Sequence, residues 1–99
     1  MSALVELAIF PTDQTESKSA FVARVIEVIR ESGLPYQLTA MGTIIEAESL
    51  SEIFAVIEKA YDELEVDCNR IYSVIKIDYR KGPVGRLEKK VASVEEKLH

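Results

Sequence analysis

Cysteine and histidine are nearly missing from this chain. Cys68 is the only cysteine and His99, the last residue, is the only histidine. A lone cysteine excludes a disulfide within the chain, and we interpret Cys68 as a small apolar core residue. A catalytic thiol needs a base beside it, and a zinc-type site needs several nitrogen or sulfur ligands. The sequence therefore argues against Cys–His catalysis and against Cys/His metal sites.

Long apolar runs and an excess of basic residues are also missing. No run approaches the roughly 20 apolar residues that span a bilayer, and the first residues lack the basic start of a signal peptide. Lys and Arg number 12 against 17 for Asp and Glu, a net charge of −5. Phosphate binding usually requires a basic surface. We expect a cytoplasmic protein that has neither nucleic acid nor membrane as its partner.

The composition that remains is that of an ordinary globular domain. Hydrophobic residues make up 47% and charged residues 29% of the 99 positions, values typical of a folded soluble chain. This length fits one domain over residues 1–99. A domain of this size has a thin core and often gains stability by oligomerisation.

The spacing of apolar residues predicts four strands and three helices. Alternation predicts strands at 3–11, 36–41, 43–48 and 70–80. A helical period predicts helices at 17–32, from 49 to about 65, and from about 86 onward. Capping boxes precede the first two helices, at Asp13/Glu16 and Ser49/Glu52. The order β-α-β-β-α-β plus a terminal helix predicts an α+β fold, the ferredoxin-like βαββαβ arrangement with a four-stranded antiparallel sheet.

In such a fold two helices cover one face of the sheet, and the other face is left apolar. The residues predicted on that outer face are Leu4, Ala8, Phe10, Ile44, Tyr72 and Val74. This is too much apolar surface for a small monomer, so we expect a partner subunit to cover it. The last helix carries a heptad-like seam of Leu87, Val91, Val94 and Leu98. That seam could join the same contact or pack on its own sheet.

Glu46 is the most informative single residue, because it interrupts an apolar strand that begins after Gly42. A carboxylate in apolar surroundings is costly unless it is paired. Alternation places Glu6 and Lys76 on the same face. An interface salt bridge and a small polar ligand site both explain the group. Glycosidase-type catalysis is disfavoured by the nearby lysine, and a metal site that adds Asp78 is disfavoured because hard cations prefer loop ligands.

Three hydroxyl groups lie near this strand or open the first helix. Thr43 and Tyr36 lie near opposite ends of the hairpin strands, and Ser19 belongs to the first turn of the helix. Each could orient a ligand, and helix N-termini can bind anions. Strand propensity for Thr43, core packing for Tyr36 and simple capping for Ser19 are the alternative explanations. The sequence also contains no glycine-rich phosphate loop, no nucleophile elbow and no zinc-protease motif. Since none of these motifs is present, we assign no catalytic residue.

Five segments carry a family resemblance: 17–23, 32–36, 41–48, 70–71 and 76–80. With the Gly-Thr-x-x-Glu and Lys-Ile-Asp-x-Arg patterns, the chain resembles the small thiamine-binding proteins of the YkoF-like group. It departs from the family at Ala47, where a glycine is usual, and in the loop 12–14, which lacks a glycine. The resemblance implies binding of thiamine or its hydroxymethylpyrimidine half without turnover, and assembly as dimers or dimers of dimers.

The resemblance also suggests how the site residues act. The Glu46 carboxylate could bind the edge of the pyrimidine through charge-assisted hydrogen bonds, with Thr43 and Tyr36 beside it and Ser19 and Phe10 farther out. An aromatic ring of Tyr36, Phe10 or Tyr72 could face the cationic thiazolium. We expect a non-enzymatic binding protein that needs no cofactor, takes thiamine or its precursor as ligand and forms a homotetramer.

Other readings of the same fold stay open. An ACT-like regulatory sensor would bind an amino acid at a subunit interface, although it normally accompanies a catalytic domain. An acylphosphatase would need an arginine in the loop after the first strand, and residues 11–16 contain none. An oligomer without a ligand is the remaining alternative.

Overall fold

The computed structural model describes residues 1–15 and 17–98. The Glu16 half of the predicted first capping box and the terminal His99 lie outside the described residues. Within these described residues, four strands and three helices follow one another as β1 Ser2–Pro11, α1 Lys18–Glu31, β2 Tyr36–Thr39, β3 Gly42–Ala47, α2 Leu50–Glu65, β4 Ile71–Arg80 and α3 Arg86–Glu96. The predicted order of elements is confirmed, and β2 ends two residues earlier than predicted because the chain already turns at 40–41.

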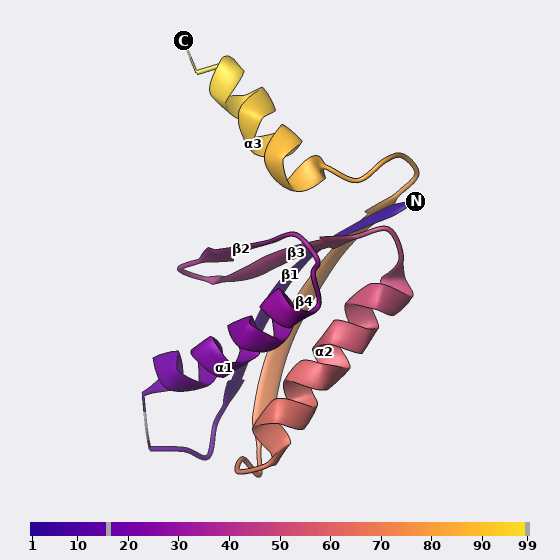
Figure 1. Cartoon of the computed structure of the whole chain (residues 1–99). Helices are drawn as coiled ribbons and strands as arrows, with labels where there is room; N and C mark the ends of the chain where they lie inside the picture. The colour runs from indigo at the N-terminus through magenta and orange to yellow at the C-terminus, as the bar shows by residue number, and fades with distance from the viewer. Residues whose placement is uncertain (16, 99) are drawn as a thin grey trace.

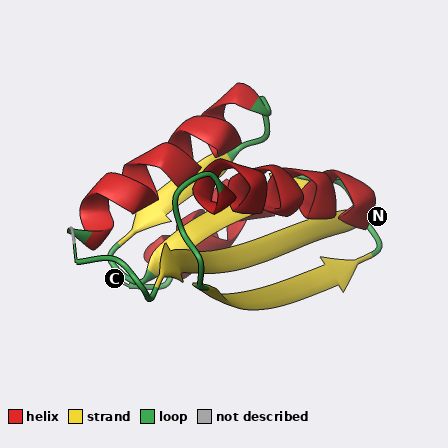
Figure 2. Ribbon diagram, turned by 90° about the horizontal axis from the view of Figure 1, so that it is seen from below, coloured by secondary structure: helices red, strands yellow, loops and turns green. Residues whose placement is uncertain are grey.

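The strands form one antiparallel sheet in the order β2-β3-β1-β4 (Figures 1 and 2). Glu6 of β1 lies opposite Ile44 of β3 and opposite Lys76 of β4. The register therefore confirms the ferredoxin-like arrangement and places the even-numbered residues of β1 on the predicted outer face, with β1 between β3 and β4.

Helices α1 and α2 cover the inner face of the sheet (Figure 2). Their apolar stripes and the odd-numbered residues of β1 form the buried core, which includes Val5, Leu7, Phe21, Val25, Ile29, Ile45, Ile53, Ala60 and Leu64. Ser49 caps α2 by accepting a hydrogen bond from the Glu52 amide at 3.3 Å. Gly33 follows α1 with a φ of 77°, a left-handed conformation that favours glycine at a helix end.

The outer face of the sheet is left open by the rest of the described chain. Tyr72 and Val74 are exposed, and Phe10 lies with its ring centre 5.7 Å from that of Tyr72. Helix α3 projects away from the sheet instead of folding over it (Figure 1), and its seam residues Val91, Val94 and Leu98 are exposed. Of the two placements open for the seam, packing on its own sheet is therefore wrong.

Candidate ligand-binding site

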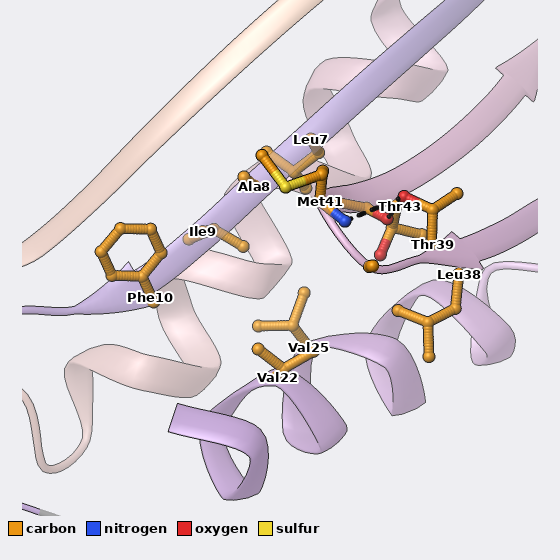
Figure 3. A pocket seen from close by; sticks show the side chains of 12 residues that line it. Leu7, Ala8, Ile9, Phe10, Val22, Val25, Leu38, Thr39, Met41 and Thr43 are labelled. Carbon is orange, nitrogen blue, oxygen red and sulfur yellow. Dashed lines mark hydrogen bonds between the residues drawn. The ribbon is translucent and has the colours of Figure 1, made fainter. Parts of the chain in front are cut away.

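A cavity of about 280 Å³ lies between β1, α1 and the β2–β3 turn (Figure 3). Its walls come from β1, from α1 and from the β2–β3 hairpin, which extends over α1 at this end of the sheet. The lining consists of Leu7, Ala8, Ile9, Phe10, Val22, Val25, Leu38, Thr39, Ala40, Met41, Gly42 and Thr43. Its two side-chain hydroxyls, those of Thr39 and Thr43, both belong to the hairpin.

Hydrogen bonds and close packing fix the turn that closes the cavity. The Thr39 hydroxyl donates to the Gly42 carbonyl at 2.8 Å and accepts from the Met41 amide at 3.2 Å (Figure 3). A Cβ at Gly42 would lie 3.0 Å from the Leu7 carbonyl oxygen, so only glycine lets the turn approach β1 this closely. The cavity is therefore preformed, as small-ligand sites usually are.

Apolar walls with a polar rim define the chemistry of the cavity. Thr43 is 5% exposed, so its side chain belongs to the wall. At the other end the Lys18 ammonium donates to the Pro11 carbonyl at 3.0 Å and lies 4.7 Å from the centre of the Phe10 ring. A cation–π contact already occupies that face of Phe10. The cavity suits a flat, uncharged ring with a polar edge.

Glu46 lies near the opposite end of β3, where its carboxylate binds the N-terminus of α3. Its side chain is 2% exposed, and its carboxylate accepts hydrogen bonds from the amides of Gly85 and Arg86, both at 2.8 Å. Gly85 is the N-cap of α3, with a φ of 108° and no side chain to cap the helix. Glu46 supplies the missing cap from across the sheet and adds a negative charge at the positive end of the helix dipole.

Arg86 completes a polar cluster around the start of α3. This side chain is 2% exposed and donates to the Ser2 hydroxyl at 3.1 Å and to the carbonyls of Ser2 and Asp78 at 2.9 and 2.7 Å. Its Nη1 forms an ion pair with Asp78 at 2.8 Å. The bond from the Lys90 side chain, followed by the charge of Arg86, lowers the pKa of Asp78. The cluster joins α3 to β1, β3 and β4.

The structure therefore separates the five residues predicted for the site. Thr43 and Phe10 line the cavity, whereas Glu46 caps α3. Tyr36 lies opposite Ile45 and packs against the core. Ser19 lies at the start of α1, where its hydroxyl is 2.8 Å from that of Ser17.

The sequence left open whether Glu46 pairs with Lys76 or contacts a ligand, and in the structure Glu46 does not pair with Lys76. Lys76 pairs with Glu6 at 3.7 Å, in an exposed contact that contributes little to stability. Within residues 1–15 and 17–98, no three His, Cys, Asp or Glu side chains are grouped so that they could hold a metal ion.

Sequence reasoning missed two groups of residues that matter here. Thr39 and Met41 build the turn over the cavity, and the signal for them was their position beside Gly42. Arg86 and Ser2 build the cluster at the start of α3. The signal that α3 is capped by a distant residue was that the helix begins after Gly85, with no Ser, Thr, Asp or Asn at its N-cap.

A second hollow of about 280 Å³ lies beside Glu46, with Glu48 and Glu52 in its lining.

Comparison with known proteins places the chain in a family. The thiamine-binding protein family matches residues 5–95, and the chain belongs to it. A UPF0045 protein of Mycobacterium bovis is 38% identical over 98 residues, covering 99% of this chain and 96% of that protein. The UPF0045 protein YqgV of Bacillus subtilis is 36% identical over 102 residues, with 97% of each chain covered.

Solved structures agree with this fold. A hypothetical protein from Methanocaldococcus jannaschii superimposes with a TM-score of 0.84 at 32% identity, covering 96% of this chain and 97% of that one. A Thermotoga maritima protein, provisionally assigned to thiamine biosynthesis or salvage, has a TM-score of 0.82 at 24% identity, with 95% and 99% covered. In the described part of the chain, the helices are too short or too polar to cross a membrane.

Proposed function

We propose that this protein binds thiamine or its hydroxymethylpyrimidine half without turning it over, in the cavity between α1 and the β2–β3 turn. The observation that carries the proposal is the preformed apolar cavity beside Gly42 and Thr43, in a chain of the thiamine-binding family. Sequestration or delivery of the ligand in the cytoplasm would be its role. Apolar walls provide the contact area, and the hairpin hydroxyls can orient a ring nitrogen or amino group.

The size and charge of the cavity favour the pyrimidine half. Its volume of about 280 Å³ lies at the lower end of the range for small-molecule sites, which suits one ring better than two. The Lys18 ammonium over Phe10 opposes a second cation there. The aminopyrimidine would therefore enter the cavity, and the thiazolium would stay at its mouth, away from Phe10.

The acidic hollow beside Glu46 is the competing location for the same ligand. Glu48 and Glu52 could attract a thiazolium, and the sequence singled out Glu46 as the pyrimidine anchor. The Glu46 carboxylate is already engaged by the α3 amides. A ligand there would have to compete with the helix cap, so we favour the cavity lined by Thr43.

Calorimetric titration with thiamine and with hydroxymethylpyrimidine tests the proposal. We expect Thr43→Val to weaken binding by about 1 kcal/mol, the usual loss of one hydrogen bond. Thr12→Val, which changes an exposed threonine outside the cavity, should leave the affinity unchanged. If Glu46→Gln weakens binding and Thr43→Val does not, the ligand lies in the acidic hollow. If neither ligand binds while amino acids raise the melting temperature, a sensor function replaces the proposal.

Assembly as a homo-oligomer, a dimer of dimers, is part of the same proposal. The exposed outer face and the exposed seam of α3 support it, because apolar surface of this kind usually marks an interface. Light scattering on the purified chain provides the test, and a monomer at micromolar concentration would contradict it.

A further inference from the structure

Strand β1 extends beyond the strand beside it at the cavity. Its register with β3 ends at the pair Leu7↔Thr43, whereas its register with β4 continues to Pro11. The β2–β3 hairpin turns back at residues 40–41, so β3 ends before it reaches Ile9. The edge of β1 that faces the hairpin is therefore open from Ile9 onward, and this opening is part of the cavity.

The bonding pattern of the sheet gives the direction of the Ile9 backbone groups. The Thr12 amide donates to the Arg70 carbonyl at 2.9 Å, and this pair continues the β1–β4 register. Hydrogen-bonded residues alternate along an antiparallel pair, so the even-numbered residues of β1 bond to β4 and the odd-numbered residues face β3. The Glu46 amide donates to the Pro35 carbonyl at 3.0 Å, which likewise leaves the odd-numbered residues of β3 to bond to β1. Both patterns direct the N–H and C=O groups of Ile9 into the opening.

Among the described residues, these two groups of Ile9 have no hydrogen-bond partner. The Met41 amide, which a longer hairpin would place opposite, donates to the Thr39 hydroxyl instead, at 3.2 Å. The next carbonyl on the same side of β1, that of Pro11, accepts from the Lys18 ammonium at 3.0 Å. Ile9 is only 5% exposed, and buried backbone groups almost always have a partner. One donor and one acceptor therefore remain to be satisfied within the cavity.

Building on the proposed function, we propose that the Ile9 backbone recognises the edge of the ligand's ring. The Ile9 N–H donates to a ring nitrogen, and the Ile9 C=O accepts from an amino group on the adjacent ring carbon. The ligand class is then a six-membered nitrogen heterocycle with an amino group beside a ring nitrogen, and the aminopyrimidine of thiamine has this edge. The ring lies in the plane of the sheet and takes the place that the next residue of β3 would occupy.

The walls of the cavity suit a flat ring in this position. Val22 and Val25 of α1 lie on the helix side of the opening (Figure 3), so one face of the ring contacts apolar side chains. Thr43 lines the cavity where β3 begins. Because Ile9 bonds only one edge of the ring, the Thr43 hydroxyl remains for a different ring position, and the two contacts can be tested separately.

The order of donor and acceptor at Ile9 selects between related rings. An amino group beside a ring nitrogen presents a donor next to an acceptor, which complements Ile9 directly. In an oxo analogue the same edge presents a carbonyl acceptor next to an N–H donor, so the ring must turn over to meet both groups, and its other substituents then move to new positions. A site that hydrogen-bonds a polar edge rejects an analogue that leaves buried groups unpaired. The cavity should therefore prefer aminopyrimidines to oxopyrimidines.

Amide hydrogen exchange followed by NMR tests the open edge in the parent chain. Without ligand, the Ile9 amide should exchange about tenfold faster than the Leu7 amide, which faces β3. Saturation with hydroxymethylpyrimidine should slow the Ile9 amide about tenfold and leave the Ala8 amide, which bonds to β4, nearly unchanged. If Ile9 is as protected as Leu7 in the free chain, the edge is closed and the inference is overturned, whether or not thiamine binds.

Two substitutions at position 9 separate the backbone contact from the side chain. Ile9→Pro removes an N–H that neither neighbouring strand uses, a kind of position where strands tolerate proline. It should weaken the binding of hydroxymethylpyrimidine about tenfold in calorimetric titrations, with the circular dichroism spectrum of the parent. Ile9→Val shortens the same buried side chain but keeps the N–H, so it should bind as the parent does. Equal affinity of the folded Ile9→Pro and Ile9→Val variants would overturn the inference.

A ligand analogue tests the same contact without depending on the folding of a variant. The oxo analogue of hydroxymethylpyrimidine, in which a carbonyl replaces the amino group, should bind the parent chain about tenfold more weakly. Equal affinity for the two rings, or unchanged Ile9 exchange in a chain saturated with hydroxymethylpyrimidine, would overturn the inference and leave the proposed binding function intact. Failure of both thiamine and hydroxymethylpyrimidine to bind would overturn the two together.

Discussion

The two ends of β3 have opposite chemistry. At Gly42 and Thr43 the strand begins beside an apolar cavity closed by a tight turn. At Glu46, near the end of the strand, a buried carboxylate caps α3 within a polar cluster. One short strand thus borders an apolar cavity at one end and holds, near its other end, the buried carboxylate that joins β3 to α3.

The difference shows that a buried charge need not mark a ligand site. Glu46 has its hydrogen-bond partners within the chain, so its burial costs little and needs no ligand. The residues that line the cavity near Thr43 are all uncharged, and the Lys18 ammonium contacts only the ring of Phe10 among them. Substitutions at the two ends of β3 should show whether the attachment of α3 and the binding of a ligand can be altered independently.

Removing the Arg86 side chain should have the largest effect on stability. Arg86→Ala removes the buried hydrogen bonds from the guanidinium to Ser2 and to the Asp78 carbonyl, together with the ion pair to Asp78. A hydrogen bond made by a charged group contributes about 1.5–3 kcal/mol, so we expect a loss of about 2–4 kcal/mol in the free energy of unfolding. Chemical denaturation provides the measurement. Lys89→Ala, on the exposed side of α3, serves as the matched control and should change little.

A side chain at Gly42 should destabilise the other end of the strand. A Cβ there meets the Leu7 carbonyl at 3.0 Å, so Gly42→Val must push the turn away from β1. Such overpacking costs about 1–3 kcal/mol, and the cavity should lose ligand affinity at the same time. Gly82→Val also strains the backbone, because Gly82 has a φ of 122°, but nothing lies within 4 Å of the added Cβ. This variant therefore serves as the control for the binding measurement. Intact affinity in Gly42→Val would place the ligand elsewhere.

The sequence predicted the fold better than it predicted the contacts of Glu46. Alternation and helical period depend on neighbours within a few residues, and they identified the seven elements of the described chain and the face of the sheet that carries Glu46. The partner of Glu46 is the backbone of 85–87, about 40 positions away. Side-chain patterns carry no information about backbone amides. The one signal in the sequence was that Gly85, at the start of α3, has no side chain that could cap the helix. The cavity likewise depends on how far the hairpin overhangs α1, which no local pattern encodes.

Removal of the Glu46 carboxylate should loosen α3 and leave the cavity intact. Glu46→Gln keeps one acceptor oxygen but loses the charge at the helix N-terminus, and loss of a cap costs about 1 kcal/mol. Hydrogen exchange of the amides in 86–96 should accelerate, while those of β1 keep their protection. Glu48→Gln, an exposed neighbour in the same hollow, should not alter exchange in α3. Unchanged exchange in the Glu46 variant would show that Arg86 alone holds the helix.

Protonation of Asp78 in acid should weaken the attachment of α3. We expect this to be the smallest of the four effects on stability. Lys90 and Arg86 hold the pKa of Asp78 below its ordinary value of 3.8. A lowered folded-state pKa stabilises the fold above the unfolded-state value, and this contribution disappears as the pH falls through the folded-state value. Protonation below about pH 4 should therefore weaken the hold on α3, seen as broadening of the α3 amide signals in NMR spectra. Asp78→Asn removes the titrating group, so its α3 signals should respond less to acid than those of the parent chain. An equal acid response in both would assign the transition to other carboxylates, such as Asp67, whose pKa Arg24 also lowers at the far end of the helix layer.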